Sequence, residues 1–230
     1  MTVIEHNGKQ YGLGRTINHD PRSKMFPAPT AALRTVHHQH HGPILDQGQL
    51  GSCTGNAMAQ ALNTGPLLPD GRRLLNEQDA VGIYSWATHH DGFPGVYPPT
   101  DTGSSGLAVA KAVRGFGLIS SFHHAFGLQH CLGALVLSPV IIGVSWKSTM
   151  FEVGADGYLN IHGPTAGGHE VALIGLDVDL REVTLLNSWS AGWGVPAPEC
   201  GIPDGGTARL AWTDLGDLLA QQGDVTVPVL

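Results

Sequence analysis

The chain has 230 residues, of which 42% are hydrophobic and 13% charged, so it has the composition of a folded protein and ample length for a buried core. Its formal net charge of −7 argues against nucleic acid or an anionic membrane as a partner, because both attract basic surfaces. Three cysteines are too few for a disulfide scaffold, and the first residues lack the basic region and apolar run of a signal peptide, so we expect free thiols in a reducing compartment, the cytoplasm or a virion.

Residues 1–42 are predicted to form an N-terminal arm of mixed polar residues and prolines. Within the arm, four histidines fall in five positions: His37, His38, His40 and His41. Such a cluster could bind a transition metal, but no cysteine or acidic residue lies nearby at metal-site spacing. We therefore expect a polar arm that leads into the next loop, with no metal site and no other cofactor.

Residues 46–57 are predicted to be a glycine-containing loop that runs into a helix over 53–64. Ser52 is a good N-cap, which places Cys53 in the first helical turn. Unpaired N–H groups and the helix dipole there favour negative charge, and the thiolate is the nucleophilic form of cysteine. A single cysteine in an apolar setting is more often an inert core residue, so a catalytic Cys53 needs partners elsewhere in the chain.

Two more helices are expected in the first half of the chain, over 76–89 and 106–114, with a Gly- and Pro-rich surface loop between them. The longest apolar region, 132–146, is interrupted by Ser138-Pro139 and is too short to span a bilayer. We interpret it as the end of a helix, a proline turn and a buried strand.

From residue 139 onward, short apolar runs separated by turn residues replace the helical pattern. The predicted strands cover 140–146, 157–161, 169–177, 181–187 and 207–212, and a helix and a closing strand follow within 213–230. This pattern indicates an antiparallel barrel or sandwich. The chain therefore divides into a mainly helical part, 43–135, and a mainly β part, 136–230, with a cleft expected between them.

The β part contains two motifs that supply partners for the cysteine. Gly168-His169-Glu170 begins an apolar strand, and Asn187-Ser188-Trp189 follows the next predicted strand. A catalytic cysteine needs a base to take its proton, and the base needs a third group to orient it. Cysteine, histidine and asparagine, in this chain order, supply all three.

Together with Gln47 just upstream of the cysteine, these motifs resemble the papain-like cysteine peptidases over residues 40–215. Leu50 and Thr54 stand where that family usually has Cys and Trp, so the stretch looks like a bacterial or viral branch of the family. The resemblance implies a papain-like two-lobe α+β fold for residues 43–230, with a helical lobe, a β lobe and the active site between them.

The resemblance also implies a role for each motif residue. Cys53 would be the nucleophile, paired as a thiolate with the imidazolium of His169, and Asn187 would orient that ring. The Gln47 side chain and the Cys53 backbone N–H would form the oxyanion hole. Trp189 would either cover the Asn–His hydrogen bond or serve as a core aromatic. The implied activity is that of a cysteine endopeptidase acting on peptide or protein substrates.

Candidate substrate-binding residues follow from the same resemblance. Gly103, just before a predicted helix, would offer its backbone to the substrate, and Gly168 lies beside the catalytic histidine. Glu170 and Gly143 would line the pocket for the second residue before the scissile bond. A partly buried carboxylate at Glu170 would favour Arg or Lys there; alternatively, Glu170 faces solvent or pairs with a nearby base.

Three other functional classes stay open, of which one is a metal-binding protein that uses its 13 histidines. The same catalytic residues could serve a Cys-dependent amidase or acyltransferase. The chain could also be a catalytically silent or gated papain-fold subunit that binds an unknown partner in a larger assembly, such as a virus particle. The intact set of Gln47, Cys53, His169 and Asn187 argues against a silent subunit.

Overall fold

The computed structural model describes residues 1–230 and contains five α-helices, three 3₁₀ helices and ten strands. The helices are α1 Cys53–Leu62, α2 Glu77–Thr88, α3 Gly106–Gly115, α4 Gly127–Leu135, α5 Trp212–Ala220, η1 Pro21–Met25, η2 Ser148–Phe151 and η3 Pro198–Cys200. The strands are β1 Thr2–His6, β2 Lys9–Leu13, β3 Val36–His37, β4 Ser121–Ala125, β5 Val140–Lys147, β6 Thr165–Asp177, β7 Glu182–Leu186, β8 Val195–Ala197, β9 Ile202–Ala211 and β10 Asp224–Val229. The predicted α+β class is confirmed.

One antiparallel sheet organises the molecule. Its strand order is β4-β10-β5-β6-β7-β9-β8, and the short β3 also pairs with β6. The two outer strands of this order do not pair with each other, so the sheet stays open and does not close into a barrel. The part predicted to be mainly helical, 43–135, contributes β4 to this sheet, a strand that the sequence pattern did not predict.

The strand predicted over 157–161 is wrong. Gly157 has a left-handed φ of 84°, and its N–H donates to the carbonyl of Gly154, so the chain turns at this point. Only isolated bridges form here, from Leu159 to Val153 and from Tyr158 to Arg209. The turn residues outweigh the short apolar pattern that follows them.

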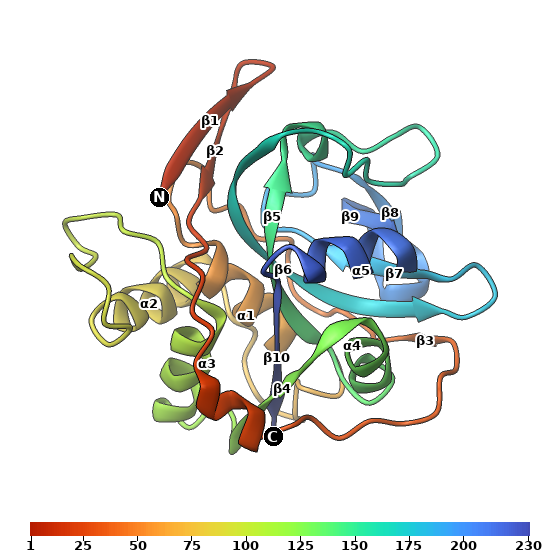
Figure 1. Cartoon of the computed structure of the whole chain (residues 1–230), viewed down its shortest axis with the longest axis horizontal. Coiled ribbons are helices and arrows are strands. Elements are labelled where there is room, and N and C mark those ends of the chain that lie inside the picture. Colours follow the sequence, from red (N-terminus) through yellow and green to blue (C-terminus); the bar gives the residue numbers. More distant parts are fainter.

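Helices cover both faces of the sheet (Figure 1). Successive strand residues point to opposite faces, and Ile141 and Ile142 of β5 accordingly belong to different hydrophobic clusters. Ile142 packs in the cluster that contains apolar residues of α4 and α5. Ile141 packs in the cluster with apolar residues of α1, α2 and α3. The sheet therefore anchors the helical half of the chain as well as the β half.

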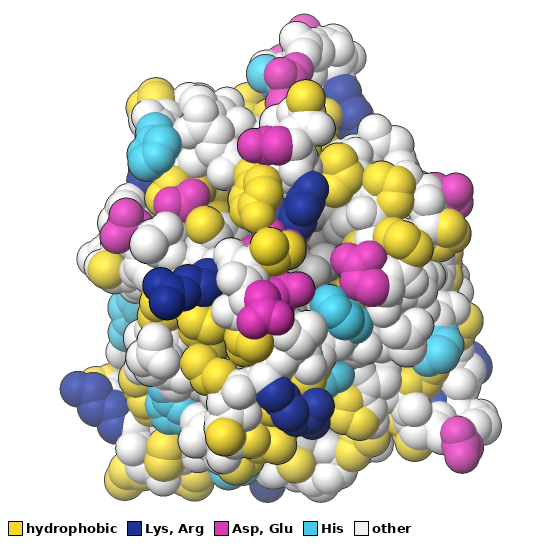
Figure 2. Space-filling view, turned by 90° about the vertical axis from the view of Figure 1, so that its right-hand side faces the viewer, with side chains coloured by type: hydrophobic (Ala, Val, Ile, Leu, Met, Phe, Trp, Pro, Cys, Tyr) yellow, Lys and Arg dark blue, Asp and Glu magenta, His cyan; other side chains and the backbone are white.

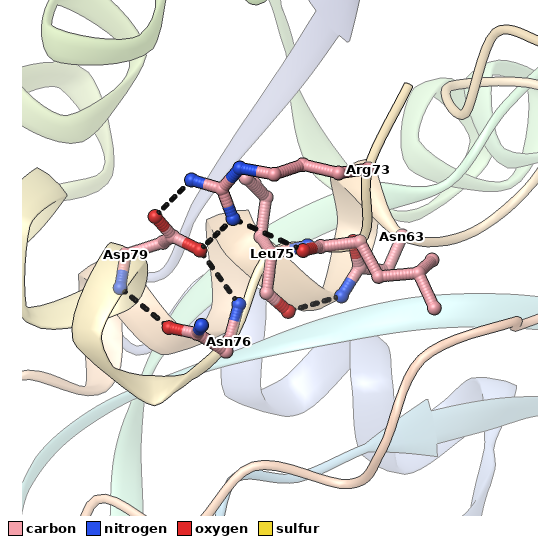
Figure 3. A network of polar contacts seen from close by, with 6 residues as sticks. Asn63, Arg73, Leu75, Asn76 and Asp79 are labelled. Carbon is pink, nitrogen blue, oxygen red and sulfur yellow. Dashed lines mark hydrogen bonds and ion pairs between the residues drawn. The ribbon is translucent and has the colours of Figure 1, made fainter. Parts of the chain in front are cut away.

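Polar contacts fix the start of α2 next to the end of α1 (Figure 3). Asn76 and Asp79 form a reciprocal capping box, and Arg73 pairs with the Asp79 carboxylate at 2.6 Å. The Asn63 side chain both donates to and accepts from the backbone of Leu75 at 2.8 Å. These bonds hold the loop between the two helices in place.

The N-terminal arm is more structured than its composition predicts. Strands β1 and β2 pair only with each other, and this hairpin projects from the rest of the molecule (Figure 1). At the end of β2 the chain enters the body of the protein, where Leu13, the last residue of this strand, and Arg15 are buried.

No helix combines the length and the apolar character that crossing a membrane requires. On the face shown in Figure 2, acidic, basic and apolar side chains are interspersed, and the Lys and Arg side chains are scattered.

Candidate active site

Cys53 is the first residue of α1, as predicted, and it is fully buried. Ser52 precedes it at the N-cap, but its side chain makes no capping bond and instead donates to Asn56 Oδ1 at 2.8 Å. All residues of α1 are buried, and the helix packs so closely on α2 that a Cβ at Gly55 would lie 2.2 Å from the Ala80 carbonyl oxygen. Cys53 is therefore attached to a closely packed helix.

His169 and Asn187 come from neighbouring strands, β6 and the end of β7. The His169 Nε2 lies 2.8 Å from Asn187 Oδ1, which also accepts the backbone N–H of Ser188 at 2.8 Å. Since the amide oxygen only accepts, His169 carries its proton on Nε2. Its buried Nδ1 has no hydrogen-bond partner, so it is free to act as a base.

Aromatic rings enclose this hydrogen bond. The Trp189 ring stacks on the His169 ring with centroids 4.7 Å apart and planes 24° apart, and the Trp146 ring meets His169 edge-on at 4.7 Å. Trp189 also belongs to the hydrophobic cluster on that face of the sheet. Trp189 thus shields the imidazole from water and is a core residue at the same time.

Hydrogen bonds connect both Gln47 and helix α1 to the residues that follow β7. The Ser188 hydroxyl donates to Gln47 Oε1 at 2.7 Å, which orients the Gln47 amide group. The Gln60 side chain of α1 donates to the backbone carbonyl of Asn187 at 3.1 Å. These bonds bring together the elements that carry Gln47, Cys53 and Asn187, as predicted from their order in the sequence.

The N-terminal arm occupies this site as an extended segment, residues 12–16. The Gln47 Nε2, the expected oxyanion donor, donates to the carbonyl of Gly12 at 3.0 Å. Backbone bonds join Arg15 N–H to the Gly168 carbonyl at 3.0 Å, Thr16 N–H to the Ser104 carbonyl at 2.6 Å, and Ser104 N–H to the Gly14 carbonyl at 2.8 Å. A peptide backbone already lies where a substrate would be expected.

The sequence Gly12-Leu13-Gly14-Arg15 fits this position because alternate residues of an extended chain face opposite sides. A Cβ at Gly12 would lie 2.4 Å from the Leu50 carbonyl oxygen, and one at Gly14 would lie 1.9 Å from that of Gly51. Only residues without a side chain allow the arm to lie so close to the backbone of Leu50 and Gly51, in the loop that precedes Cys53. The intervening side chain of Leu13 packs where Gly167 leaves space.

The covered site holds the cysteine and histidine in their neutral forms. Burial and the charge of Glu170 raise the pKa of the Cys53 thiol to about 12, against the backbone N–H groups of Gly14, Glu170 and Thr54 that lower it. Burial lowers the pKa of His169 to about 4, although its bond to Asn187 raises it. The expected thiolate–imidazolium pair is therefore absent in this state, because desolvation outweighs the effect of the helix N-terminus.

The candidate substrate-binding residues surround the arm. Gly168 pairs with the backbone of Arg15, and Gly143 and Glu170 lie against the Arg15 side chain. The N–H of Gly103 donates to the Tyr84 hydroxyl at 2.9 Å, and the backbone that pairs with the arm is that of the next residue, Ser104.

The sequence patterns missed Arg15, Ser104, Ser188 and Asp224. Ser104 and Ser188 adjoin residues that were singled out, whereas Arg15 and Asp224 carry no sequence signal.

The histidine cluster of the arm is divided among separate contacts. The His38 Nε2 bonds to the Leu135 carbonyl at 2.7 Å, and the buried His40 Nδ1 bonds to the Thr64 hydroxyl at 2.9 Å. His37 lies beside Glu199 and Cys200, with candidate ligand atoms within 4.8 Å of one another. All three cysteines are free thiols.

No protein-family model and no curated protein sequence matches this chain. Three solved structures are similar to it over most of its length. Xylellain, a cysteine protease from Xylella fastidiosa, has a TM-score of 0.67 and 16% identity, with 99% of each chain covered. Digestive procathepsin L 3 from the larval midgut of Tenebrio molitor has a TM-score of 0.63 and 16% identity, covering 95% of this chain and 76% of that one.

The cysteine protease CMS1MS2 of Carica candamarcensis has a TM-score of 0.55 and 18% identity, covering 82% of this chain and 92% of that one. Identities this low establish the fold alone. The chain therefore has a papain-like α+β fold, as expected.

Proposed function

We propose that the protein is a cysteine endopeptidase whose cleft is closed by its own N-terminal arm in this state. The observation that carries the proposal is the extended segment 12–16, whose backbone pairs with Ser104 and Gly168 and meets the Gln47 amide. A site that binds extended backbone on both sides of a cysteine suits the cleavage of polypeptides.

In the proposed reaction, withdrawal of the arm admits water and substrate and so restores the ordinary acidity of the thiol. His169 Nδ1 takes the Cys53 proton, and the thiolate attacks the substrate carbonyl carbon. The Gln47 amide and the Cys53 N–H stabilise the oxyanion. His169 then protonates the leaving amine, and water, activated by the same ring, hydrolyses the thioester.

Asn187 keeps the His169 ring in the tautomer that this sequence of steps requires, since its oxygen accepts the Nε2 proton. Leu50, which precedes α1, and Thr54, the second residue of α1, support placing the chain in a bacterial or viral branch of papain-like peptidases. The arm supports a gated enzyme over a silent subunit. In a subunit without activity, nothing would require a segment that pairs with the backbone donors and acceptors of the site, as the arm does.

The test is a time course of intact mass with an epoxysuccinyl peptide inhibitor, run alongside hydrolysis of fluorescent casein. We expect one adduct that forms slowly on the wild type and is lost in Cys53→Ala and His169→Ala. Casein hydrolysis should depend on the same two residues. An adduct without hydrolysis, but with transfer to an added amine, would instead indicate an acyltransferase. No adduct and no hydrolysis after the arm is displaced would indicate a silent subunit.

A further inference from the structure

Three neighbouring strands place two carboxylates on either side of a glycine. Asp224 of β10 lies directly opposite Gly143 of β5, and Gly143 lies directly opposite Glu170 of β6. Residues opposite each other on adjacent strands point to the same face of a sheet. Because the middle residue has no side chain, a space remains between the two carboxylates.

The dimensions of this acidic pocket, formed by Gly106, Gly143, Glu170 and Asp224, depend on its glycines. A Cβ at Gly143 would lie 2.7 Å from Asp224 Oδ1 and 2.7 Å from Glu170 Oε2. At Gly106, the first residue of α3, a Cβ would lie 2.5 Å from Glu170 Oε1. Any other residue at either position would fill the space that the carboxylates and their occupant share.

Arg15 of the arm fills the acidic pocket. Its Nε donates to Asp224 Oδ1 at 3.1 Å, and its Nη2 donates to the same carboxylate and, at 2.6 Å, to the carbonyl of Gln222. The side chain is 1% exposed. Gln222 adopts a left-handed φ of 64°, uncommon for a residue other than glycine, in presenting this carbonyl.

Glu170 has hydrogen-bond acceptors that Arg15 does not use. It is fully buried, and neither of its carboxylate oxygens has a hydrogen-bond partner. Burial and the neighbouring Asp224 hold the pKa of Glu170 well above its usual range, against the opposite effect of Arg15. The Glu170 carboxyl therefore lies unpaired beside the Arg15 guanidinium, in a pocket where Asp224 makes the ion pair.

We propose that the acidic pocket selects substrates by a guanidinium side chain, and that Arg15 is the resident occupant which such a side chain replaces. The neighbouring residue Gly14 packs against the backbone of Gly51, two residues before Cys53, so the pocket lies beside the loop that leads to Cys53. Arginine is preferred over lysine, because its planar fork matches the Asp224 carboxylate and the Gln222 carbonyl together. This specificity rests on the proposed peptidase function.

The test uses full-length Arg15→Ala protein, in which the pocket has lost its occupant. Tripeptide chloromethyl ketones would carry arginine, lysine or citrulline at the second residue from the reactive carbon; citrulline matches arginine in length but is neutral. The rate of Cys53 alkylation is measured by intact mass. We expect the arginine reagent to react at least tenfold faster than the citrulline reagent, with lysine between them.

Both carboxylates face the space at Gly143, so Glu170→Gln or Asp224→Asn should each keep part of this preference. The double variant should lower the ratio to about one, whereas a matched double change at two exposed positions outside the pocket, Glu199→Gln with Asp204→Asn, should leave it unchanged. Equal rates for the arginine and citrulline reagents on folded Arg15→Ala protein would overturn the proposal, without any need for the double variant.

Failure of all reagents on folded Arg15→Ala protein would overturn it too, since the vacated pocket would then be closed to ligands. Alkylation needs only a reactive Cys53 and a bound peptide. Charge-dependent alkylation without hydrolysis of casein would therefore refute the peptidase function and leave the pocket assignment standing.

Discussion

Adding a single methyl group at Gly14 should open the active site. The Cβ of Gly14→Ala would lie 1.9 Å from the Gly51 carbonyl oxygen and 2.5 Å from its carbonyl carbon, both of them backbone atoms that cannot rotate away. The segment 12–16 would then leave its place and give up four backbone hydrogen bonds, made by the N–H groups of Gly12, Arg15, Thr16 and Ser104. At about 1 kcal/mol each, these bonds stabilise the closed state by about 4 kcal/mol.

A difference of about 4 kcal/mol corresponds to roughly a thousandfold change in the open fraction. We therefore expect iodoacetamide to alkylate Cys53 about a thousandfold faster in Gly14→Ala than in the wild type, as measured by peptide mapping. Gly82→Ala is the matched control, because nothing lies within 4 Å of its added Cβ. Equal alkylation rates for the two folded variants would refute the reasoning that the arm covers the thiol.

Three further predictions concern the site and the buried histidines. Gln47→Ala should accelerate Cys53 alkylation, because the Gly12 carbonyl loses its hydrogen-bond donor. The same change should lower kcat on peptide substrates by about 10²–10³, because the oxyanion loses that donor as well. If the alkylation rate and kcat rose or fell together, this double role of Gln47 would be contradicted. Asn187→Ala should lower kcat and also destabilise the protein by about 1–3 kcal/mol, since His169 Nε2 would be left buried without a partner; kinetics and urea unfolding measure the two effects, and an unchanged stability would argue against this bond. Acidification should lower the free energy of unfolding between about pH 6.5 and pH 4, because burial holds the pKa of His40 and of His169 at about 4 and the unfolded chain takes up protons first. Urea titrations at a series of pH values should show that the free energy of unfolding falls less steeply with decreasing pH in His40→Gln than in the wild type.

The arrangement of the candidate catalytic residues could be predicted because local patterns determine it. Cys53 begins a helix after a glycine-containing loop, His169 lies on β6, and Asn187 directly follows β7, two strands that the apolar runs predicted. Strands that follow each other in an antiparallel sheet pair directly, as β6 and β7 do. Because these two strands are consecutive in the chain and adjacent in the sheet, His169 and Asn187 lie close together.

The closure of the site could not be predicted, because it depends on contacts between distant segments. Gly12 and Gly14 form no motif, and their meaning appears only once the nucleophile loop lies against them. Glu170 was recognised as a candidate, but the alternative of a solvent-facing side chain is wrong, because Arg15 and Asp224 come from opposite ends of the chain to enclose its pocket.

Ionisation was also mispredicted, since the position of Cys53 at a helix N-terminus suggested a thiolate. A helix terminus contributes less than complete removal from water, which raises the pKa of the thiol to about 12. Only the packed structure reveals how far the arm excludes solvent.

The attachment of the arm to the same chain has a kinetic consequence. An inhibitor carried on its own target acts at a fixed effective concentration, so dilution of the protein does not release it. A substrate that binds only the open state meets an apparent dissociation constant raised by the inverse of the open fraction. Once the arm has withdrawn and a substrate is bound, turnover is unaffected by that equilibrium. Under the proposed peptidase function, the segment 12–16 therefore raises the substrate concentration needed for half-maximal rate by the inverse of the open fraction, and leaves the maximal rate unchanged.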